Sequence, residues 1–414
     1  MAVRFHGNFT QQEPISEEAI ARAVAIMRSG RLHRYNTLAG EVSEVALLEL
    51  KFRELIGSAY CLAVTSGGYA MTTALRAAGL EAGEAVLTNA FTLSPVPGAI
   101  FAAGGRPVLV EITQDLVIDL TDLRAKALAS QARFLLLSHM RGHIVNMDQL
   151  MSLCRSLQIT LIEDCAHTMG AAWADVPTGR YGLVGCFSTQ TYKNLNSGEG
   201  GLLVTDDAQV MARATLLSGS YMLYGRHPAG PPVEMFENSR WQMPNCSGRL
   251  DNLRAAILRP QLPHLAGNAA RWNERYQTVI AEIKGVKGIV LPERPVEEKF
   301  VASSVQFRLP ALDAAAMQSF LQRCFVRGVD LKWFGAPQPV GYTSTHHSWQ
   351  YVDAQSLPNT DKILATLCDM RLPLTFSLAD CRTIGQIIRE AASESMDAVP
   401  MSERRDAFFA RDIA

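Results

Sequence analysis

Short apolar runs alternate with amphipathic stretches through much of the chain from about residue 60. The stretches between the runs have helical spacing, as in YAMTTALRAAGL and MDQLMSLCRSL. The runs themselves are rich in Val, Leu and Ile: CLAVTS, EAVLTN, RPVLVEI, FLLLSH and ITLIED. Parallel strands joined by right-handed helical crossovers produce this pattern, and their sheet is covered on both faces. We therefore predict an α/β fold with a mostly parallel sheet sandwiched by helices.

The spacing changes after Asp164. Two further strands are expected in GCFSTQ and GGLLVTD, and a long helical stretch follows from about Leu250 to Ile283. Beyond it, the strand pattern SSVQFRLP and the helix patterns DAAAMQSFLQRC and DCRTIGQIIREAA are typical of a smaller α+β domain. We predict an N-terminal arm and large domain over residues 1–287, a small domain over 288–393, and a polar, loosely ordered tail over 394–414.

Composition and charge narrow the class of partner. The 414 residues are 48% hydrophobic, which is enough to bury a sizeable core. Lys plus Arg (39) nearly balances Asp plus Glu (40), so no net field draws the chain to nucleic acid or to an anionic membrane. The start, MAVRFHGNFTQQEPISEEAI, lacks the pattern of a signal peptide, and no apolar run reaches the length that a bilayer requires. We expect a cytoplasmic protein whose partners are small molecules and its own copies.

The eight cysteines are scattered, mostly in apolar surroundings. They contain no Cys-x-x-Cys pair, so the spacing of a metal site is absent. Free buried thiols are therefore expected rather than disulfides or metal ligands, and we predict no metal.

Polar residues at the ends of predicted strands are the candidates for chemistry, because ligands of open α/β sheets lie beyond the carboxyl ends of the strands. Asp164 ends one such strand, although an aspartate there is equally typical of a helix N-cap. Lys193 lies in a glycine-bearing turn between two strands, where an ordinary surface lysine fits equally well. Gly67 and Gly68 join a strand to a helix start, whose free N–H groups and positive dipole end can hold a phosphate.

These three features together are far more specific than any of them alone. A phosphate cradle, an acid and a lysine, each after a different strand, are what pyridoxal 5'-phosphate (PLP) needs. The lysine forms a Schiff base with the cofactor aldehyde, and the acid pairs with the pyridine nitrogen and keeps it protonated. The pattern thus indicates a PLP enzyme.

At this point the chain resembles the DegT/StrS family of aminotransferases, which are PLP enzymes of fold type I that mostly aminate keto-sugars. The resemblance runs from about Thr65 to Leu262 and more weakly beyond. Its blocks begin with TSGGYAMTTALRAAGLEAGEAVLTN and continue with IEDCAHTMGAAW, GCFSTQTYKNLNSGEGGLLVTDD and RLDNLRAAILRPQL. By this resemblance, Lys193 is the Schiff-base lysine and Asp164 is the partner of the pyridine nitrogen.

The resemblance also implies further cofactor contacts. His167 matches the position near the ring and its phenolic oxygen, although a histidine satisfied within the core is the alternative. Ser188 matches the hydroxyl that binds the PLP phosphate, and Gly67 and Gly68 match its backbone donors. The likeness therefore implies a phosphate site built from a serine and a helix start.

Some positions depart from the family pattern. Gly68 and Tyr69 stand where the family has Thr and Ala, so backbone donors remain but a hydroxyl is lost. Leu93 stands where the family has a ring-stacking aromatic residue, and a leucine lacks the aromatic quadrupole. These two differences concern the phosphate turn and the face of the ring.

A further departure concerns the neighbouring subunit. An Asn two residues before an Arg reaches the neighbour's PLP phosphate in the family. With Arg249 at the arginine, Ser247 takes that place, while Asn245 lies two residues earlier, and either could serve. The resemblance then implies a homodimer with shared active sites.

The candidates for substrate contact are cationic or aromatic. Arg141 stands where the family has a tyrosine, and its planar fork suits carboxylate or phosphate, although a solvated loop cation is equally compatible with the sequence. Tyr192, Arg249 and Lys332 are further candidates. If Arg141 faces the site, the substrate or the amino donor brings an anion there.

By resemblance, the function is transfer of an amino group from glutamate or glutamine to a keto-sugar, sugar nucleotide or keto-cyclitol in sugar or secondary-metabolite biosynthesis. One alternative is another PLP reaction such as dehydration, but in that branch of the family a histidine replaces the lysine, so Lys193 argues against it. A non-catalytic regulatory protein on the same fold is the other alternative. Such a protein is expected to lose Lys193, Asp164 or Ser188, and all three are present.

Overall fold

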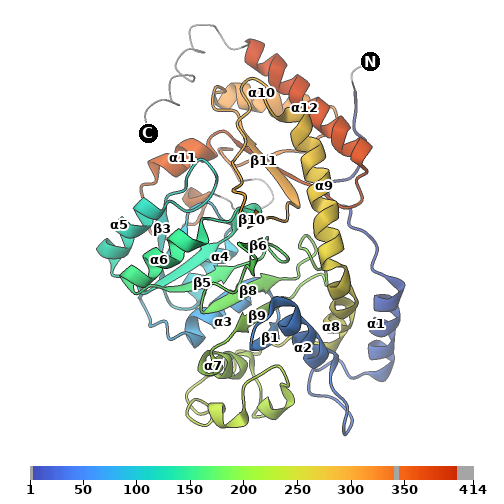
Figure 1. Cartoon of the computed structure of the whole chain (residues 1–414), viewed down its shortest axis with the longest axis vertical. Helices are drawn as coiled ribbons and strands as arrows, with labels where there is room; N and C mark the ends of the chain where they lie inside the picture. The colour runs from blue at the N-terminus through green and yellow to red at the C-terminus, as the bar shows by residue number, and fades with distance from the viewer. Residues whose placement is uncertain (1–2, 340–344, 399–414) are drawn as a thin grey trace.

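The computed structural model describes residues 3–339 and 345–398, and its central element is a seven-stranded sheet (Figure 1). The strand order is β1-β9-β8-β5-β4-β2-β3. The strands are β1 (Tyr60–Val64), β2 (Ala85–Asn89), β3 (Arg106–Val110), β4 (Phe134–Ser138), β5 (Thr160–Asp164), β8 (Val184–Ser188) and β9 (Gly201–Thr205). From β3 to β8 neighbouring strands are parallel, and β9 is antiparallel to β8 and β1. A parallel pairing needs a crossover, usually helical, whereas β8 and the antiparallel β9 are joined by residues 189–200, which contain turns but no helix. The predicted mostly parallel sheet is confirmed.

Helices cover both faces of the sheet because side chains alternate along each strand. Ile162 packs with α3, α4 and α7, whereas its neighbour Leu161 packs with α5 and α6 on the other face, where α2 and α8 cover β1 and β9. The helices are α1 (Glu17–Ser29), α2 (Glu44–Ile56), α3 (Gly67–Ala77), α4 (Pro95–Ala102), α5 (Leu120–Ser130), α6 (Met147–Leu157), α7 (Ala208–Ser218) and α8 (Asn252–Leu258). The sandwich predicted from the alternating pattern is therefore present.

The long helical stretch expected from Leu250 to Ile283 is interrupted. It consists of α8, the 3-10 segment η4 (Arg259–His264) and α9 (Leu265–Ile283). Pro260 and Pro263 lie in η4 and have no backbone N–H to donate, so one continuous α-helix is disfavoured.

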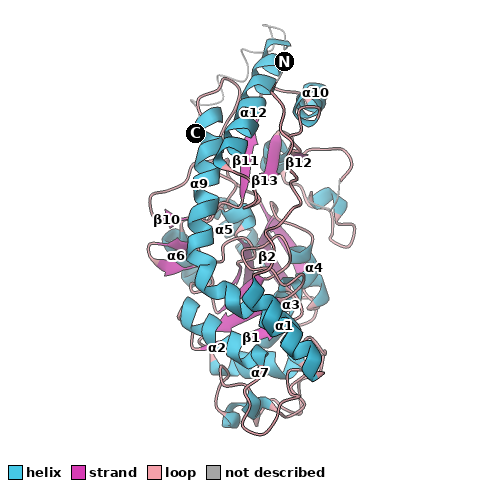
Figure 2. Cartoon of the chain, turned by 90° about the vertical axis from the view of Figure 1, so that its right-hand side faces the viewer, coloured by secondary structure: helices cyan, strands magenta, loops and turns pink. Residues whose placement is uncertain are grey.

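A second sheet and its helices lie at the other end of α9. The order β11 (Ser304–Arg308), β13 (Leu367–Arg371), β12 (Lys332–Trp333) is antiparallel throughout. Figure 2 shows α12 beside α9, and Ile283 of α9 is buried in the same core as Phe307 and Ile384. The accompanying helices are α10 (Ala314–Phe325), α11 (Pro358–Leu364) and α12 (Leu378–Ala398). The division at residue 287 stays a prediction, since α9 contributes to this core as well as to the larger one.

The start of the predicted tail is helical. Ser395 and Met396 are buried in the last turns of α12, so residues 394–398 belong to the packed structure, and the remainder of the predicted tail, residues 399–414, lies outside the described residues. The other short elements are β6 (Ala172–Trp173), β7 (Val176–Pro177), β10 (Glu298–Lys299), η1 (Met140–Gly142), η2 (Tyr224–Arg226), η3 (Val233–Phe236) and η5 (His346–Ser348).

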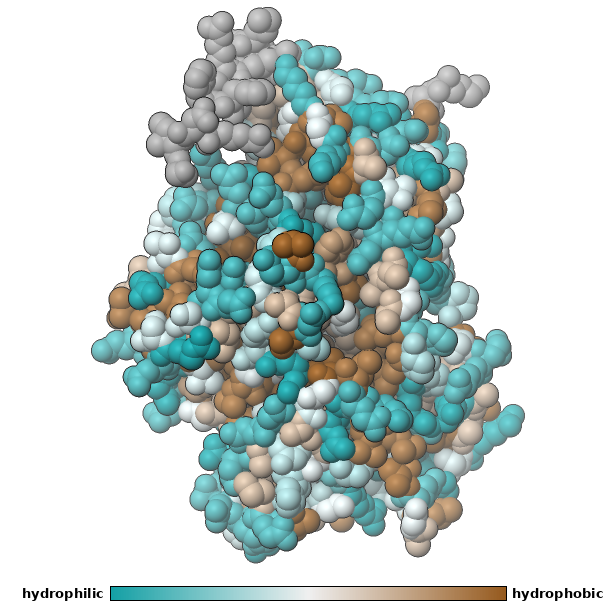
Figure 3. Space-filling model, viewed as in Figure 1, coloured by the Kyte–Doolittle hydropathy of each residue, from teal (hydrophilic) through white to brown (hydrophobic). Residues whose placement is uncertain are grey.

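The polarity of the surface and the state of the cysteines match what the amino-acid composition led us to expect. On the face drawn in Figure 3, hydrophilic side chains are interspersed with smaller groups of hydrophobic ones. All eight cysteines have free thiols, and all except Cys246 are buried, as predicted. Within the described ranges, no helix has both the length and the apolar character needed to span a membrane.

Candidate active site

Four polar side chains stand at the carboxyl ends of neighbouring strands. They end β2, β4, β5 and β8 and are, in that order, Asn89, Ser138, Asp164 and Ser188. Parallel strands end at the same edge of a sheet, so the fold gathers these groups where ligands of open α/β sheets bind. Two of the sequence-predicted residues, Asp164 and Ser188, belong to this row.

The carboxylate of Asp164 is buried and held in place by two donors. Ser138 Oγ donates to Oδ2 at 2.9 Å, and the backbone N–H of Ala166 donates to Oδ1 at 3.1 Å. Thr92 Oγ1 in turn donates to Ser138 Oγ at 2.8 Å. Turns rather than a helix follow Asp164, so the alternative interpretation as a helix N-cap is wrong. The side chain is an oriented acceptor with remaining capacity for a cationic N–H.

Lys193 lies beside His167, with Nζ 3.1 Å from His167 Nε2. Burial lowers the pKa of Lys193 to about 7, the charges of Arg141 and Arg371 act in the same direction, and Asp164 opposes them. The amine is therefore uncharged in a large fraction of molecules near neutral pH, as a nucleophilic lysine requires.

His167 is not satisfied by the core alone, because its partner is the candidate lysine. Burial first, and then the charges of Lys193, Arg141 and Arg371, hold the pKa of His167 well below its ordinary value. A neutral imidazole next to Lys193 can accept a hydrogen bond from the ammonium or donate one to the amine, depending on its tautomer.

The start of α3 and Ser188 form a cradle for an anion. Ser66 caps the helix by accepting from the N–H of Tyr69 at 3.1 Å, which orients the first turn. The first N–H groups of a helix, here those of Gly67 and Gly68, have no intrahelical acceptor. A Cβ on Gly67 would come within 2.9 Å of Ser188 Cβ, so only glycine lets the two elements approach this closely. This arrangement fits a phosphate group.

Two predicted cofactor residues have contacts away from this cradle. The Tyr69 hydroxyl donates to the carbonyl of Leu217 at 3.0 Å, and its ring lies against Gly248. Leu93 packs on an apolar cluster that includes Phe91. Their roles toward the cofactor stay predictions.

The segment expected to reach a neighbouring subunit is exposed. Asn245 Oδ1 accepts from the N–H of Ser247 at 3.0 Å and from its Oγ at 3.3 Å. Arg249 donates to the carbonyl of Gly219 at 2.9 Å, and its guanidinium lies 4.8 Å from the ring centroid of Tyr221. Arg249 is thus engaged within its own chain, whereas the two side chains before it are on the surface.

Arg141 is buried, so the interpretation as a solvated loop cation is wrong. Its Nη2 donates to Asp369 Oδ2 at 2.6 Å. This ion pair joins η1, which follows β4 of the larger sheet, to β13 of the smaller sheet. Its φ of 57° lies in the left-handed region that non-glycine residues rarely adopt. Backbone held in such a conformation is frequent at functional sites.

Two further cations lie on the same face of the small sheet. Lys332 is paired in register with Asp369, and Arg371 is two residues farther along that strand. Burial lowers the pKa of Lys332 to about 8, with Asp369 opposing and the charges of Arg141 and Arg371 reinforcing the effect. The charges of Arg141 and Arg371 therefore act on Lys332 from close by, and the three side chains form a group of cations near Asp369.

Arg371 connects these cations with the segment that carries Lys193, because it contacts the ring of Tyr192. The guanidinium of Arg371 lies 3.8 Å from the ring centroid of Tyr192, the residue before Lys193. Arg371 and Asp369 were missed in the sequence, although the charged positions in the otherwise apolar run LCDMRLPL were a usable signal.

Lys193 also borders a cavity of about 290 Å³. Residues 12–16 line it together with Arg271 and Trp272 of α9. The N-terminal segment therefore lies next to the candidate lysine and forms part of the surroundings of the site.

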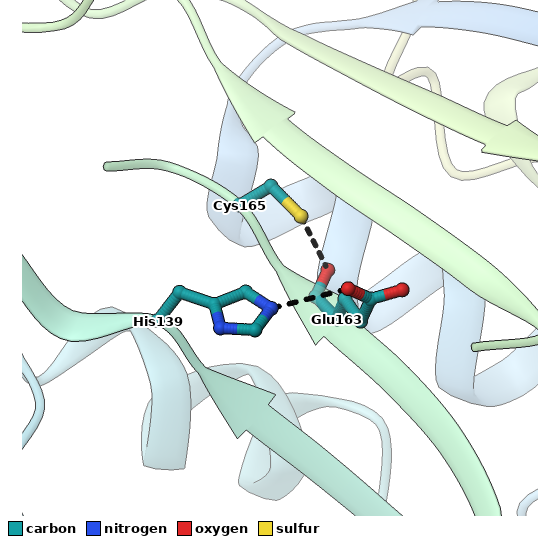
Figure 4. Close-up of side chains that lie close together, drawn as sticks. All are labelled: His139, Glu163 and Cys165. Carbon is teal, nitrogen blue, oxygen red and sulfur yellow. Dashed lines mark hydrogen bonds and ion pairs between the residues drawn. The ribbon is translucent and has the colours of Figure 1, made fainter. Parts of the chain in front are cut away.

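A second polar cluster, built around Glu163, the residue before Asp164, supports the fold (Figure 4). The buried Glu163 carboxylate accepts from the backbone N–H groups of Gly179 (2.9 Å), Tyr181 (2.8 Å) and Gly182 (2.8 Å). It also lies 3.1 Å from His139 Nε2, whereas Cys165 Sγ contacts the Glu163 backbone carbonyl at 3.9 Å. Although these ligand types lie close together, the carboxylate oxygens are engaged in holding the loop before β8.

Comparison with known proteins gives a consistent result. Residues 13–389 match the profile of the DegT/DnrJ/EryC1/StrS aminotransferase family. The chain is 31% identical over 256 residues to the L-glutamine:scyllo-inosose aminotransferase of Streptomyces griseus, a match that covers 62% of this chain and 60% of that enzyme. It is 28% identical over 277 residues to the UDP-N-acetyl-3-dehydro-alpha-D-glucosamine 3-aminotransferase of Acidithiobacillus ferrooxidans, covering 64% of this chain and 69% of the relative.

The solved structures agree on the fold. The crystal structure of 3-amino-5-hydroxybenzoic acid synthase superposes with a TM-score of 0.80 at 22% identity, covering 95% of this chain and 100% of that one. At this identity the likeness shows the fold, which is that of the PLP-dependent aminotransferases.

Proposed function

Because the chain belongs to the DegT/DnrJ/EryC1/StrS aminotransferase family, we propose that it is a PLP-dependent aminotransferase that moves an amino group from glutamate or glutamine to a keto-sugar or keto-cyclitol. The observation that carries the proposal is Lys193, whose pKa of about 7 accompanies a contact with His167 near the row of strand ends that includes Asp164. The named relatives act on a cyclitol and on a sugar nucleotide, and these are the acceptor classes that we propose.

The residues present fit the cofactor. The N–H groups of Gly67 and Gly68 and the hydroxyl of Ser188 would hold its phosphate, Asp164 would accept from its pyridine nitrogen, and Lys193 would attach to its aldehyde. When bound, PLP supplies an electron sink for the carbon that loses a proton. The lack of a Cβ at Gly67 is the feature that best supports a phosphate there.

In this proposal each side chain of the site has a separate role in the reaction. Lys193 Nζ, with a pKa near neutrality, can remove a proton from the amino donor and later return it. His167 Nε2 lies 3.1 Å away and orients this amine. Asp164, fixed by Ser138, stabilises positive charge on the ring nitrogen.

The cations near Lys193 support an anionic group on the donor or on the acceptor, because the charges of Arg141 and Arg371 both act on this lysine. Arg141 is bound to Asp369 and Arg371 lies over the ring of Tyr192, and the carboxylate of glutamate or glutamine is an anion of suitable geometry for an arginine fork. We propose that these cations orient the amino donor.

We also propose a homodimer in which the exposed Asn245 or Ser247 completes the phosphate site of the partner subunit. Mixed dimers test this. A Lys193→Ala chain still offers that segment, and a chain changed at both Asn245 and Ser247 still offers its lysine, so mixing should restore part of the activity. The double mutant must first be shown to dimerise. Full activity of the double mutant, or an active monomer by light scattering, would exclude shared sites.

The alternative functions are less well supported. The dehydration branch of the family replaces the lysine by histidine, and this chain keeps Lys193. A regulatory protein without activity has no need to keep Lys193, Asp164 and Ser188, and these groups lie in neighbouring elements at one sheet edge.

Spectroscopy and product analysis test the function. Purified protein with PLP should absorb in the visible region and change on addition of glutamate or glutamine, whereas Lys193→Ala should not reproduce the wild-type band. A screen of keto-sugars and keto-cyclitols with both donors, followed by mass spectrometry, should reveal an aminated product. Protein that stays colourless after incubation with PLP would overturn the proposal.

A further inference from the structure

A cluster of metal-ligating side chains lies outside the candidate active site, where η5 meets α11. His346 and His347 of η5 both direct Nε2 at Asp361 Oδ1, at 2.8 and 3.0 Å. Their ring centroids are 3.8 Å apart, and the three ligand atoms lie within 4.8 Å of one another. Two neighbouring imidazoles that converge on one carboxylate oxygen form a chelating arrangement.

From this geometry we infer that His346, His347 and Asp361 form a binding site for a divalent transition-metal ion of the zinc class. Two imidazole nitrogens and one carboxylate oxygen are a ligand set that zinc accepts, with water completing the coordination. With metal–ligand bonds of about 2.0–2.1 Å, the ligands of a tetrahedral zinc ion are about 3.3 Å apart. The two nitrogen–oxygen distances need to lengthen by only a few tenths of an ångström to reach this value.

The chemistry of the three groups suits a cation. Without an ion, each Nε2 lies within hydrogen-bond distance of Asp361 Oδ1, and a bound cation would take the place of the proton between them. Glu111 adds a further negative charge near His346. The side chains of His347 and Asp361 are 66% and 42% exposed, which leaves room for water ligands and for entry of the ion.

Packing holds the two ligand-bearing segments in place before any ion binds. Trp349 follows η5 and Leu357 precedes α11, and the two are buried in one apolar cluster. Glu111 accepts from the N–H groups of Asn359 and Thr360 at 3.1 and 2.7 Å, which fixes the first turn of α11. A preorganised site loses less entropy on binding an ion.

The position of the site suggests what a bound ion would do. The chain after η5 packs on α4, where the Tyr351 hydroxyl donates to the carbonyl of Ser94 at 3.1 Å and its ring contacts Phe101. Ser94 follows Leu93, a candidate for the cofactor ring. An ion that joins η5 to α11 would therefore hold in place the segment that packs on α4 next to Leu93. Because the ion binds the folded chain, it would also raise the thermal stability of the protein.

Metal titration of the chelator-treated holoenzyme tests the site. Co²⁺ should give visible d–d absorption that saturates at one ion per chain, Zn²⁺ should displace it, and Zn²⁺ should raise Tm. His347→Ala and Asp361→Asn remove one ligand each, from an exposed and a half-buried position, and His6→Ala removes an exposed imidazole elsewhere as the matched control.

The expected outcome separates the variants. Since loss of even an outer-shell partner typically weakens a metal site by about ten- to a hundredfold, loss of a direct ligand should weaken binding at least as much. His6→Ala should bind like the wild type, and all variants should keep the PLP absorbance, so this result does not depend on the aminotransferase proposal. Equal binding by all four proteins, or no saturable binding by the wild type, would overturn the inference.

Discussion

The depressed pKa of Lys193 leads to a measurable prediction for the cofactor-free enzyme. Burial lowers this pKa from an ordinary 10.5 to about 7, with the charges of Arg141 and Arg371 acting in the same direction. At pH 7, a lysine of ordinary pKa is uncharged in about 0.03% of molecules, whereas Lys193 is uncharged in about half, an increase of roughly 1,500-fold. Because only the uncharged amine attacks an aldehyde, Lys193 should capture PLP far faster than other lysines at neutral pH.

The assay is the rate of visible absorbance gained when cofactor-free enzyme is mixed with PLP, measured from pH 5.5 to 10. The rate should rise as pH increases through about 7 and then level off, because the group loses its proton in that range. Arg371→Gln removes a charge that disfavours the ammonium, so the inflection should move to higher pH. Arg371→Lys keeps the charge and should leave the inflection near the wild-type value.

Two results would refute this reasoning. An inflection near pH 10 in the wild type would mean that Lys193 is an ordinary solvated lysine. Identical profiles for Arg371→Gln and Arg371→Lys would mean that the guanidinium above Tyr192 does not act on Lys193 through its charge.

The other predictions concern the acid and the phosphate cradle. Asp164→Asn should still bind PLP but turn over roughly 10- to 150-fold more slowly, because a hydrogen bond to a charged group contributes about 1.5–3 kcal/mol; near-normal kcat would exclude the proposed role. Gly67→Ala places a Cβ 2.9 Å from Ser188 Cβ and should weaken PLP binding by about 1–3 kcal/mol, as measured by equilibrium titration. Gly68→Ala is the matched control, since its Cβ would meet its nearest neighbour at 3.9 Å, and equal effects of the two substitutions would argue against a steric cause.

Much of the fold and of the cofactor site could be predicted because these features are encoded locally. Strand periodicity predicted the parallel sheet, and Asp164 and Ser188 each stand directly at a strand end. Gly67 opens a helix immediately after a strand, so its place at the sheet edge follows from chain connectivity. By contrast, Pro260 and Pro263 were present in the sequence, but the 3-10 break that they accompany was not predicted.

The sequence by itself therefore determined the sandwich of helices and strands and the sheet edge at which the candidate active site lies. It also determined the candidate lysine, Lys193, and the candidate acid, Asp164. Each of these features depends on residues that are close together in the chain. Only the tertiary structure decided that Arg141 is buried against Asp369, 228 residues away, and that Arg371 stacks on Tyr192 beside Lys193. The same holds for the pKa of Lys193, since burial and long-range charges depend on distances through space that no local pattern records.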